Sequence, residues 1–589
     1  MERIPSREAK PNLHLNVIII VVWVVVFCTA FIYSFPSILN GDLGDNDNYM
    51  RLHQVSTFIQ SPSLYQLPFE RFNPEDGRVM HWSRIVDVPV ALVIWLTGYV
   101  VSEPLAVALS LFFVPTLYFL GLLYLVARLT SKIFGLYPAV IVAIFAPFSI
   151  VYAKFAPGYI DHHNLQLLLF ILFLNLVPFS ENKQVSAIYR GVASGSVLAV
   201  SLLIGLEAIP AYFCTLLTGM CFLTKQRGLD YSWVYLGYTG IACALVGLLG
   251  LTIFEPMEVI LEPVFDVATY PLFLLSLVVG ITFIVSSRKG SVFFTLTLIL
   301  ACIVGSLFLY PDMLASPYQN YPRLLSYFWL DHVSEAKPLI SYMLSGGQLT
   351  VVLIAVCYIV ITTASIVTTT STHQKWLWMI AFLLLLPLLF WQLRLLPFYV
   401  LVSLPLQANL IYALYSKITT RFIRLTPFML AMPTIVVPIM YNSAVGSEPS
   451  QAPVSRLWRL DAVEVLNKNQ LREHKILTSL ETASPILALT ENSVISGPYH
   501  RNVNGNTKAI EAFSTHTSAV LANSLKQQNI SLIIVDKRDP QLSMIAKATP
   551  PTSLVNMLLS GQVPEWLSYV DGNEQGLAVY QLKGLNNDE

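Results

Sequence analysis

The chain has 589 residues, of which 55% are hydrophobic and only 12% are charged, whereas soluble domains contain roughly 25% charged residues. Lys plus Arg and Asp plus Glu number 35 each, so the net charge indicates neither an acidic nor a basic partner. Apolar runs of about 18 residues or more, each long enough to cross a bilayer, recur through the first three quarters of the chain. All six cysteines lie in apolar runs, which argues against a disulfide framework. These features exclude a soluble enzyme, a disordered scaffold and a nucleic-acid binder, and they predict a polytopic membrane protein.

The first apolar stretch is predicted to be a retained membrane helix. Arg3, Arg7 and Lys10 precede an apolar run over residues 17–33, which is too long for the core of a signal peptide and lacks a small-x-small cleavage site. The hydropathy pattern predicts twelve further spans, which makes thirteen in all: 104–127, 133–153, 164–179, 191–206, 208–224, 232–254, 267–286, 291–309, 350–367, 376–393, 397–415 and 426–441.

The stretch 88–101 decides which loops lie on which side of the membrane. Its apolar core of about 14 residues is more typical of an interfacial or re-entrant segment than of a span. If it does not cross, fifteen Lys and Arg of the loops lie on the N-terminal side and eight on the other side. If it crosses, this bias is inverted, against the positive-inside rule. We therefore expect a cytoplasmic N-terminus and an extracytoplasmic tail.

This topology brings four polar segments to the same outer face: residues 36–89, the loop around Asp161, residues 310–350 and the turn around Arg394. These segments also contain the unusual polar residues of the chain. A shared face is a precondition for a single active site, and the count of basic residues alone predicts it.

The first two segments carry possible metal ligands. Asp45 and Asp47 lie in the sequence Gly-Asp-Leu-Gly-Asp-Asn-Asp-Asn-Tyr-Met-Arg, and clustered carboxylates repel one another unless a cation joins them. Asp161, His162 and His163 stand immediately before an apolar helix. Carboxylate oxygens with imidazole nitrogens suit Mn²⁺ or Mg²⁺ better than a thiolate-seeking metal. The alternative is that Asp161 merely caps the helix that follows.

The other two segments each contain one charged residue of interest. Glu335 lies in Asp-His-Val-Ser-Glu-Ala-Lys-Pro, and an isolated Glu in a long loop is usually only solvated. Arg394 lies in Trp-Gln-Leu-Arg-Leu-Leu-Pro-Phe-Tyr, at the outer end of an apolar helix. It either extends to the lipid headgroups or binds a phosphate through its planar guanidinium group. The residues alone leave both interpretations open.

In this order, the four segments resemble the GT-C superfamily of membrane glycosyltransferases, and most closely the catalytic subunits of oligosaccharyltransferases. The resemblance covers residues 1–441 in layout and implies about thirteen helices with a soluble domain on the outer face. Members have, in the first loop, an Asp followed by aromatic residues and an Arg. Asp45 has the family's spacing to Arg51, and Asp47 has its spacing to Tyr49, so both are candidate catalytic carboxylates.

The second loop matches a further motif of the family. Asp161-His162-His163 is similar to the Asp-His-His of archaeal members. The resemblance implies a divalent cation, Mn²⁺ or Mg²⁺, held by Asp47, Asp161 and one or both of His162 and His163.

The third and fourth segments match the family more loosely. The family has a Ser/Thr-x-x-Glu segment that touches the metal and the acceptor, and Val333-Ser334-Glu335 looks like a degenerate form of it. Glu335 is therefore a third catalytic candidate. A family Arg that binds the phosphate of the lipid-linked donor, followed by a Tyr, is matched by Arg394 and Tyr399.

One family motif is missing from the tail. Oligosaccharyltransferases carry Trp-Trp-Asp-Tyr-Gly there, which recognises the asparagine sequon, whereas this chain has Ser-Gly-Pro-Tyr-His-Arg-Asn at residues 496–502. We therefore expect another acceptor. The turn either reaches back to the membrane site or is an ordinary surface turn. The candidate substrate-binding residues come from this turn and from the first loop: His81, Trp82, Arg84, Tyr499, His500 and Arg501.

The expected organisation is a GT-C-like transmembrane catalytic domain over residues 1–446, with its first outer loop at 35–103, and an extracytoplasmic α/β domain over residues 447–589. In the tail, short apolar runs alternate with helical stretches, a pattern typical of a small α/β domain. Strands are expected at 486–489, 493–495, 532–535 and 577–580, with helical structure over 507–528.

The implied function is metal-dependent transfer of a sugar or oligosaccharide from a polyprenyl-(di)phosphate-linked donor to a glycan, lipid or protein acceptor. The site would face the extracytoplasmic side of the inner (plasma) membrane. The alternative is a transporter or flippase of a lipid-linked or small polar substrate. Transporters place ionisable residues near the bilayer midplane and contain inverted repeats, whereas the notable carboxylates here lie at span ends. The sugar, the acceptor and the choice between inversion and retention remain open.

Overall fold

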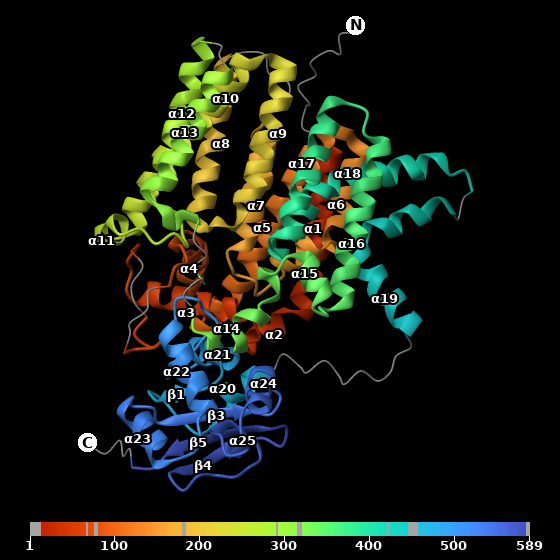
Figure 1. Cartoon of the computed structure of the whole chain (residues 1–589). Coiled ribbons are helices and arrows are strands. Elements are labelled where there is room, and N and C mark those ends of the chain that lie inside the picture. The colour runs from red at the N-terminus through yellow and green to blue at the C-terminus, as the bar shows by residue number, and fades with distance from the viewer. Residues whose placement is uncertain are drawn as a thin grey trace.

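The computed structural model describes residues 13–65, 69–75, 80–178, 184–289, 292–314, 318, 321–420, 423–445 and 458–584. Figure 1 shows a large helical part with a smaller region that contains a β-sheet at one end of it. The expected fold class, a polytopic helical membrane protein with a small C-terminal α/β region, is confirmed. The predicted boundary between residues 446 and 447 lies outside the described residues.

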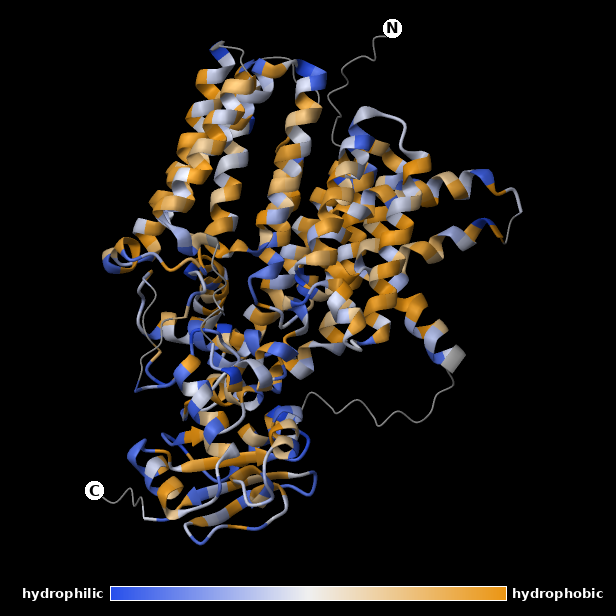
Figure 2. Cartoon of the chain, in the orientation of Figure 1, coloured by the Kyte–Doolittle hydropathy of each residue, from blue (hydrophilic) through white to orange (hydrophobic). Residues whose placement is uncertain are grey.

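Ten helices of the described part are long and apolar enough to cross a membrane, so the chain is a multi-pass integral membrane protein. They are α1 (Leu13–Tyr33), α5 (Glu103–Phe134), α8 (Gln184–Ile204), α9 (Ile209–Arg227), α10 (Leu229–Phe254), α12 (Tyr270–Lys289), α13 (Val292–Leu309), α16 (Leu349–Ala364), α17 (Thr372–Phe390) and α18 (Leu396–Lys417). Figure 2 shows their apolar residues along the helices and hydrophilic residues at the helix ends.

The predicted number of thirteen spans is not confirmed. The bent pair η9 (Ile423–Ala431) and α19 (Pro433–Val445), with an angle of 102° between its helices, would add an eleventh span. Two further apolar helices, α6 (Leu136–Phe145) and α7 (His163–Leu176), are shorter. Each predicted span coincides with an apolar helix, but these last elements are too short or too bent to count as full spans by length and composition.

Helix α18 is the centre of the helical part. In the span that contains it, 83% of the residues in an 18-residue apolar stretch are buried. Helix α18 packs against α5, α6, α16 and α17. In contrast, only 6% of the residues in the corresponding stretch of α13 are buried, as expected for a helix that faces lipid. The turn that carries Arg394 therefore stands at the end of the best-packed helix of the bundle.

Small residues allow α8 and α10 to pack closely. A Cβ atom on Gly195 would lie 2.2 Å from the carbonyl oxygen of Thr239, and one on Gly191 would lie 2.6 Å from that of Tyr235. This close packing fixes the end of α8, which leads into the short helix η3 (Leu206–Ala208). Glu207 on η3 is thereby held at the end of the bundle.

The first outer loop folds into three helices, α2 (Phe35–Leu39), α3 (Asn46–Gln60) and α4 (Arg84–Gly98). Helix α4 covers most of the ambiguous stretch 88–101. It has 15 residues with Pro89 inside, is shorter than all ten candidate spans, and packs against α3 and α5. These features agree with the prediction that this stretch does not cross the membrane.

The C-terminal region is a five-stranded sheet in the order β2-β1-β3-β5-β4. Strand β1 is parallel to β2 and β3, and β5 is antiparallel to β3 and β4. The strands are β1 (Lys475–Leu477), β2 (Ser493–Val494), β3 (Leu532–Asp536), β4 (Leu567–Gly572) and β5 (Leu577–Leu582). The helices are α20 (Trp458–Lys468), α21 (Leu480–Leu489), α22 (Val503–Ser514), α23 (Ala519–Gln527), α24 (Pro540–Ala548) and α25 (Leu554–Leu559).

The sequence prediction for this region was right in class and partly wrong in detail. The predicted strands 493–495, 532–535 and 577–580 coincide with β2, β3 and β5. The predicted strand 486–489 is wrong, because these residues lie in α21, whose N-terminus is capped by the Ser479 side chain. The predicted helical stretch 507–528 is two helices, because the Ser518 side chain caps a new helix after α22.

The first outer loop is part of the C-terminal sheet region. Phe72 forms a parallel bridge with Val494, the Asn73 amide donates to the Val494 carbonyl at 2.7 Å, and the Val494 amide donates to the Arg71 carbonyl at 3.0 Å. Met50 and Phe69 share a buried apolar cluster with residues of α20, α21 and the sheet. The two expected domains therefore share a hydrophobic core.

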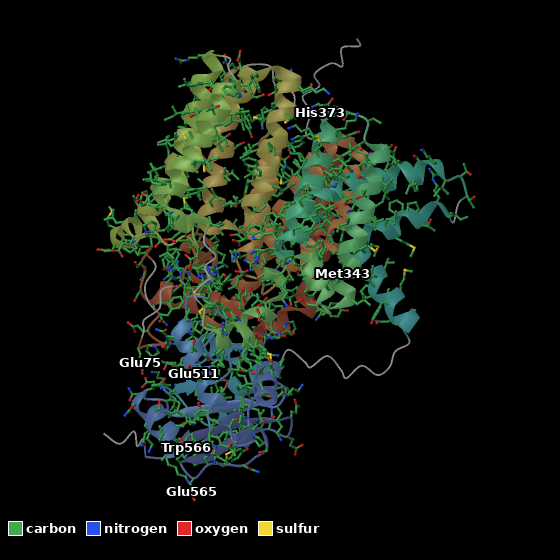
Figure 3. All side chains as sticks on the ribbon, viewed as in Figure 1. Glu75, Met343, His373, Glu511, Glu565 and Trp566 are labelled. Atoms are coloured by element: carbon green, nitrogen blue, oxygen red, sulfur yellow. The ribbon has the colours of Figure 1, made fainter. Side chains whose placement is uncertain are left out.

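Polar contacts reinforce this junction. Glu75, labelled in Figure 3, accepts from Lys475 Nζ at 2.7 Å and pairs with Lys508 at 3.4 Å. Arg71 Nη1 donates to the carbonyl oxygens of Thr490 at 2.7 Å and Asn492 at 2.9 Å. The first outer loop is thus anchored to the α/β region at several separate points.

Candidate metal and substrate site

Asp161, His162 and His163 form a compact group of possible metal ligands. One ligand atom from each lies within 4.8 Å of the other two. Asp161 Oδ1 contacts His162 Nδ1, and Asp161 Oδ2 lies 3.5 Å from His163 Nε2. Asp161 is buried, and its Oδ2 has no hydrogen-bond partner in the described part of the chain. Because a buried carboxylate oxygen without a partner is costly, this oxygen is suited to bind a cation.

Glu207 on η3 joins this group, although the sequence analysis gave it no role. Its Oε1 contacts His162 Nε2 and lies 3.7 Å from His163 Nδ1. Glu207 stands in a turn without Lys or Arg, so the count of basic residues passed over it. The predicted topology places this turn on the outer face, and that was the signal that could have found it.

The two histidines differ in how their ring nitrogens are used. Both nitrogens of His162 contact carboxylates. Burial alone lowers the pKa of His162, but the carboxylates of Asp161 and Glu207 outweigh burial and raise it to about 10. The nitrogens of His163 lie beyond hydrogen-bond distance, at 3.5 and 3.7 Å, from the nearest carboxylates. His163 is therefore the better metal ligand of the two, because a ligand needs a free lone pair.

Asn48 joins the first outer loop to the Asp161 loop. Its Oδ1 accepts from the amides of Ile160 at 3.0 Å and Asp161 at 3.2 Å, and its Nδ2 donates to the Leu43 carbonyl at 2.9 Å. Asn48 is 1% exposed. Because the bonds to Ile160 and Asp161 span more than a hundred residues of sequence, no local signal pointed to Asn48.

A buried ion cluster joins α3 to α4. Arg51 Nη1 donates to Asp87 Oδ1 at 3.0 Å, and Arg84 Nη1 donates to Asp87 Oδ2 at 3.1 Å. Gln54 Nε2 also donates to Asp87 Oδ2, at 2.8 Å. Arg51 Nη2 lies 4.0 Å from Asp161 Oδ1. Arg84, a candidate substrate residue, is 2% exposed within this cluster. Its guanidinium group therefore stabilises the contact between α3 and α4.

Asp45 and Asp47 stand at the N-terminus of α3, facing the same site. Asp45 caps the helix, since its side chain accepts from the Asp47 amide at 3.3 Å. Loss of water around the carboxyl, followed by repulsion from Asp45 and Asp161, raises the pKa of Asp47 well above its usual value. Loss of water also raises the pKa of Asp45. Asp47 lies outside the compact group formed by Asp161, His162 and His163.

Glu335 and Arg394 lie together on the same side of the bundle. Arg394 Nη2 donates to Glu335 Oε1 at 3.1 Å, and the Leu393 amide donates to the Lys337 carbonyl at 2.7 Å. Arg394 Nε is buried without a hydrogen-bond partner among the described residues. Partial loss of water around the carboxyl opposes it, but the positive charge of Arg394, followed by that of His163, lowers the pKa of Glu335.

Tyr399 does not accompany Arg394. It is 1% exposed within the apolar core around α18, and its carbonyl accepts from the Ser403 hydroxyl at 2.7 Å. Arg394 lies in the short helix η8 (Leu393–Leu395), whereas Tyr399, five positions later, lies in α18 with its side chain in the apolar core. The role predicted for Tyr399 stays untested, but in this conformation a phosphate has no access to it.

His81 and Trp82 line the space between the first loop and the C-terminal turn. The guanidinium carbon of Arg51 lies 4.6 Å from the Trp82 ring centroid, and the Trp82 ring is 6.2 Å from that of His162. The His81 ring lies 4.3 Å from the His500 ring. Burial, followed by repulsion from His500, lowers the pKa of His81 well below its usual value.

The turn at 497–502 reaches back to the membrane part, which decides between the two interpretations of it. Arg501 makes a bidentate ion pair with Asp266, at 2.7 Å for each bond, and His500 Nε2 lies 2.8 Å from Asp266 Oδ2. Asp266 is 6% exposed and lies in the loop before α12. No sequence signal pointed to Asp266, because a single Asp in a loop carries no signal of its partner.

The structure thus gathers most of the predicted residues on one face. Those gathered at or around the possible metal-ligand group are Asp45, Asp47, Asp161, His162, His163, Glu335, Arg394, His81 and Trp82. Tyr499, His500 and Arg501 border them from the C-terminal region. Arg84 and Tyr399 point into the interior instead.

No protein-family model and no curated protein sequence matches the chain. Solved structures do. The archaeal oligosaccharyltransferase AglB from Archaeoglobus fulgidus, in complex with an inhibitory peptide and a dolichol-phosphate, has a TM-score of 0.61 and 15% identity, covering 97% of this chain and 74% of that chain. The oligosaccharyltransferase from the same organism, tethered with an acceptor peptide that contains the NVT sequon, has a TM-score of 0.60 and 14% identity, with coverages of 97% and 74%.

A third structure of that oligosaccharyltransferase, a complex with Zn and sulfate, has a TM-score of 0.53 and 15% identity, covering 92% of this chain and 69% of that chain. At such identity the likeness concerns the fold. It confirms the fold that the sequence resemblance implied, a GT-C-like helical bundle with a C-terminal α/β region.

Proposed function

We propose that this chain is a membrane glycosyltransferase that moves a sugar or oligosaccharide from a polyprenyl-linked donor to an extracytoplasmic acceptor. The observation that carries the proposal is the convergence of two charged groups on one face of a GT-C-like bundle. One is the ligand group Asp161, His162 and His163, and the other is the pair Arg394 and Glu335. A transporter would need such groups near the bilayer midplane, and here they lie at helix ends.

The donor set fits a divalent cation. Among the described residues, Asp161 offers a buried oxygen without a hydrogen-bond partner, and His163 offers ring nitrogens that no carboxylate holds within hydrogen-bond distance. Asp47, whose carboxyl is repelled by Asp161, completes the set in our proposal. Oxygen ligands with imidazole favour Mn²⁺ or Mg²⁺. A bound cation would supply charge stabilisation for the leaving phosphate.

Arg394 is proposed to bind the donor phosphate. Its buried Nε has no hydrogen-bond partner among the described residues, while its Nη2 is oriented by Glu335. A planar guanidinium whose Nε–H is still available suits a phosphate oxygen. The dolichol-phosphate in the AglB complex makes a polyprenyl phosphate the natural ligand to test.

The carboxylates of the first loop are proposed to act on the acceptor. Asp47 or Asp45 would orient the acceptor group or take its proton, and of the two we favour Asp47, because Asp45 already caps α3. Glu335 would act beside them through its pairing with Arg394. The acceptor is proposed to be a glycan, lipid or protein group, and the membrane to be the inner (plasma) membrane.

The proposal is tested by transfer with purified full-length chain. The donor is a polyprenyl-phosphate-linked sugar carrying a radiolabel, the acceptor pool is a cell-envelope extract, and Mn²⁺ is present or removed with EDTA. We expect label transfer that stops with EDTA and returns with Mn²⁺. Asp161→Asn should abolish transfer while leaving the amount of membrane-inserted protein unchanged.

A matched control comes from the α/β region. Asp571 is an acidic residue paired with Lys468 at the surface, so Asp571→Asn should transfer as the unmodified chain does. Full activity of Asp161→Asn, together with indifference of the unmodified chain to EDTA, would refute the metal site. A chain that moves the intact lipid-linked donor across vesicles without transferring its sugar would be a flippase.

A further inference from the structure

We propose that the C-terminal α/β region positions the carboxylates of the first outer loop, and that Tyr499 and Glu481 are the positioning residues. This inference rests on the proposed function, because it assigns a purpose to the placement of Asp45 and Asp47. It concerns the first turn of α3, which both regions of the chain hold from opposite sides.

The C-terminal side holds Asn46, the residue between the two carboxylates. The Tyr499 hydroxyl donates to the Asn46 carbonyl at 3.0 Å, and Asn46 Nδ2 donates to Glu481 Oε2 at 3.0 Å. Asn46 is 6% exposed, so water competes little for these bonds. Backbone and side chain of one residue are thereby fixed by the α/β region.

Tyr499 is itself held firmly. It is 3% exposed, its hydroxyl lies 3.0 Å from the Ser484 hydroxyl, and its ring makes edge contacts with Phe72 and Trp82, with centroids 5.8 and 5.5 Å apart. Its ring thus packs against the first outer loop, while its hydroxyl is also held by Ser484 of the C-terminal region. The bond to Asn46 therefore has a defined geometry.

The transmembrane part holds Asn48, which lies two residues after Asn46. Asn48 Oδ1 accepts from the amides of Ile160 and Asp161 at 3.0 and 3.2 Å. Asp47 thus lies between one residue fixed by the α/β region and one fixed by the loop that carries the metal ligands. A shift of either contact moves Asp47 relative to Asp161.

Anchoring of the α/β region does not require the bonds to Asn46. The bridge between Phe72 and Val494, the ion pair between Glu75 and Lys475 and the ion pair between Arg501 and Asp266 already join the two parts. Two further hydrogen bonds, both to the single residue between Asp45 and Asp47, therefore indicate control of that turn rather than attachment of a domain.

The test uses the full chain in detergent and reads Mn²⁺ binding directly, from the electron paramagnetic resonance signal of free Mn²⁺. Tyr499→Phe keeps the ring and removes the hydroxyl. Loss of one hydrogen bond corresponds to an affinity change of about threefold to tenfold, which is the weakening of Mn²⁺ binding that we expect. Glu481→Gln should weaken binding in the same direction. Tyr569→Phe, which alters an exposed ring on β4, is the matched control and should leave affinity unchanged.

A double-mutant cycle separates positioning from general stability. If Tyr499 acts through Asp47, then Tyr499→Phe should have no further effect on Mn²⁺ affinity in the Asp47→Asn background. Full additivity of the two effects, or a lowered melting temperature with unchanged Mn²⁺ affinity, would overturn the inference. A second readout is transfer: kcat should fall while the donor KM stays constant.

The two proposals fail in different ways. Absence of both Mn²⁺ binding and sugar transfer in the unmodified chain would overturn the proposed function and this inference with it. Binding and transfer by the unmodified chain, together with unchanged Mn²⁺ affinity in Tyr499→Phe and Glu481→Gln, would overturn only the positioning role.

Discussion

Replacement of Arg394 is the sharpest test of how the donor is held. In the structure its side chain is 23% exposed and pairs at 3.1 Å with Glu335, which is 43% exposed. Arg394 Nε is buried and has no hydrogen-bond partner in the described residues. A phosphate that binds to Nε and to the remaining guanidinium hydrogens gains two charge-assisted hydrogen bonds. Lys can supply the charge but not the fixed pair of donors.

These contacts set the expected magnitude. A hydrogen bond to a charged group contributes about 1.5–3 kcal/mol, and about 1.4 kcal/mol is a factor of ten. Arg394→Lys, which keeps one of the two bonds, should therefore weaken donor affinity roughly 10-fold to 150-fold. Arg394→Ala, which loses both bonds, should weaken it by roughly 100-fold or more. The pair with Glu335 adds little to this difference, because both partners are partly exposed and screened.

The assay titrates donor at saturating acceptor and then acceptor at saturating donor. We expect the donor KM to rise in the order Arg394, Lys, Ala, while the acceptor KM changes little. Glu335→Gln separates the phosphate contact from the ion pair, and Arg472→Ala, which removes a 69% exposed surface Arg, controls for net charge. If Arg394→Ala raised the acceptor KM and spared the donor, the substrate sides would be assigned in reverse.

Three further predictions concern topology and stability. A reporter fused after Glu589 that works only in the cytoplasm should be silent, and one inserted at Gly228, between α9 and α10, should be active; the opposite pattern would reverse the proposed sidedness. Asp87→Asn leaves the buried guanidiniums of Arg51 and Arg84 without their counter-charge and should destabilise the fold by about 3–5 kcal/mol, measured by denaturant-induced unfolding. Burial raises the pKa of Asp539 to about 6 from 3.8, so its ionisation costs stability as pH rises through that range; Asp539→Asn should raise the melting temperature at pH 7.5 and leave it nearly unchanged at pH 4.

The helical part of the fold was readable from sequence because each bilayer span needs its own long apolar run. The count of spans was less secure, since α6 and α7 are apolar but short, and their backbone is covered by neighbouring helices. In the tail, the hydropathy pattern predicted a strand at 486–489, where the structure has a helix. A fully buried helix such as α21 shows an apolar run that a buried strand also shows, and the signal that distinguishes them is the Ser479 cap.

The candidate site was predictable where its residues lie in short motifs. Asp161, His162 and His163 are neighbours in sequence, and the charge count brought the Arg394 turn to the same face. Asn48, Glu207 and Asp266 could not be found in this way. Asn48 acts through amides 112 and 113 positions away, and Asp266 through residues 234 and 235 positions away. Such partners follow from packing of the whole chain, which no local pattern encodes.

The charged side chains around the candidate site are largely paired with one another. His162 is shared between Asp161 and Glu207, Arg51 is held by Asp87, and Arg394 is held by Glu335. These internal pairs leave Asp45 and Asp47 without a cationic partner within ion-pair distance in the described part of the chain, and mutual repulsion helps to raise the pKa of Asp47. In the proposed function, a bound cation would relieve this repulsion. Under the proposed function, the hydrogen bonds of Asn46 and Asn48 hold this turn in place against that repulsion.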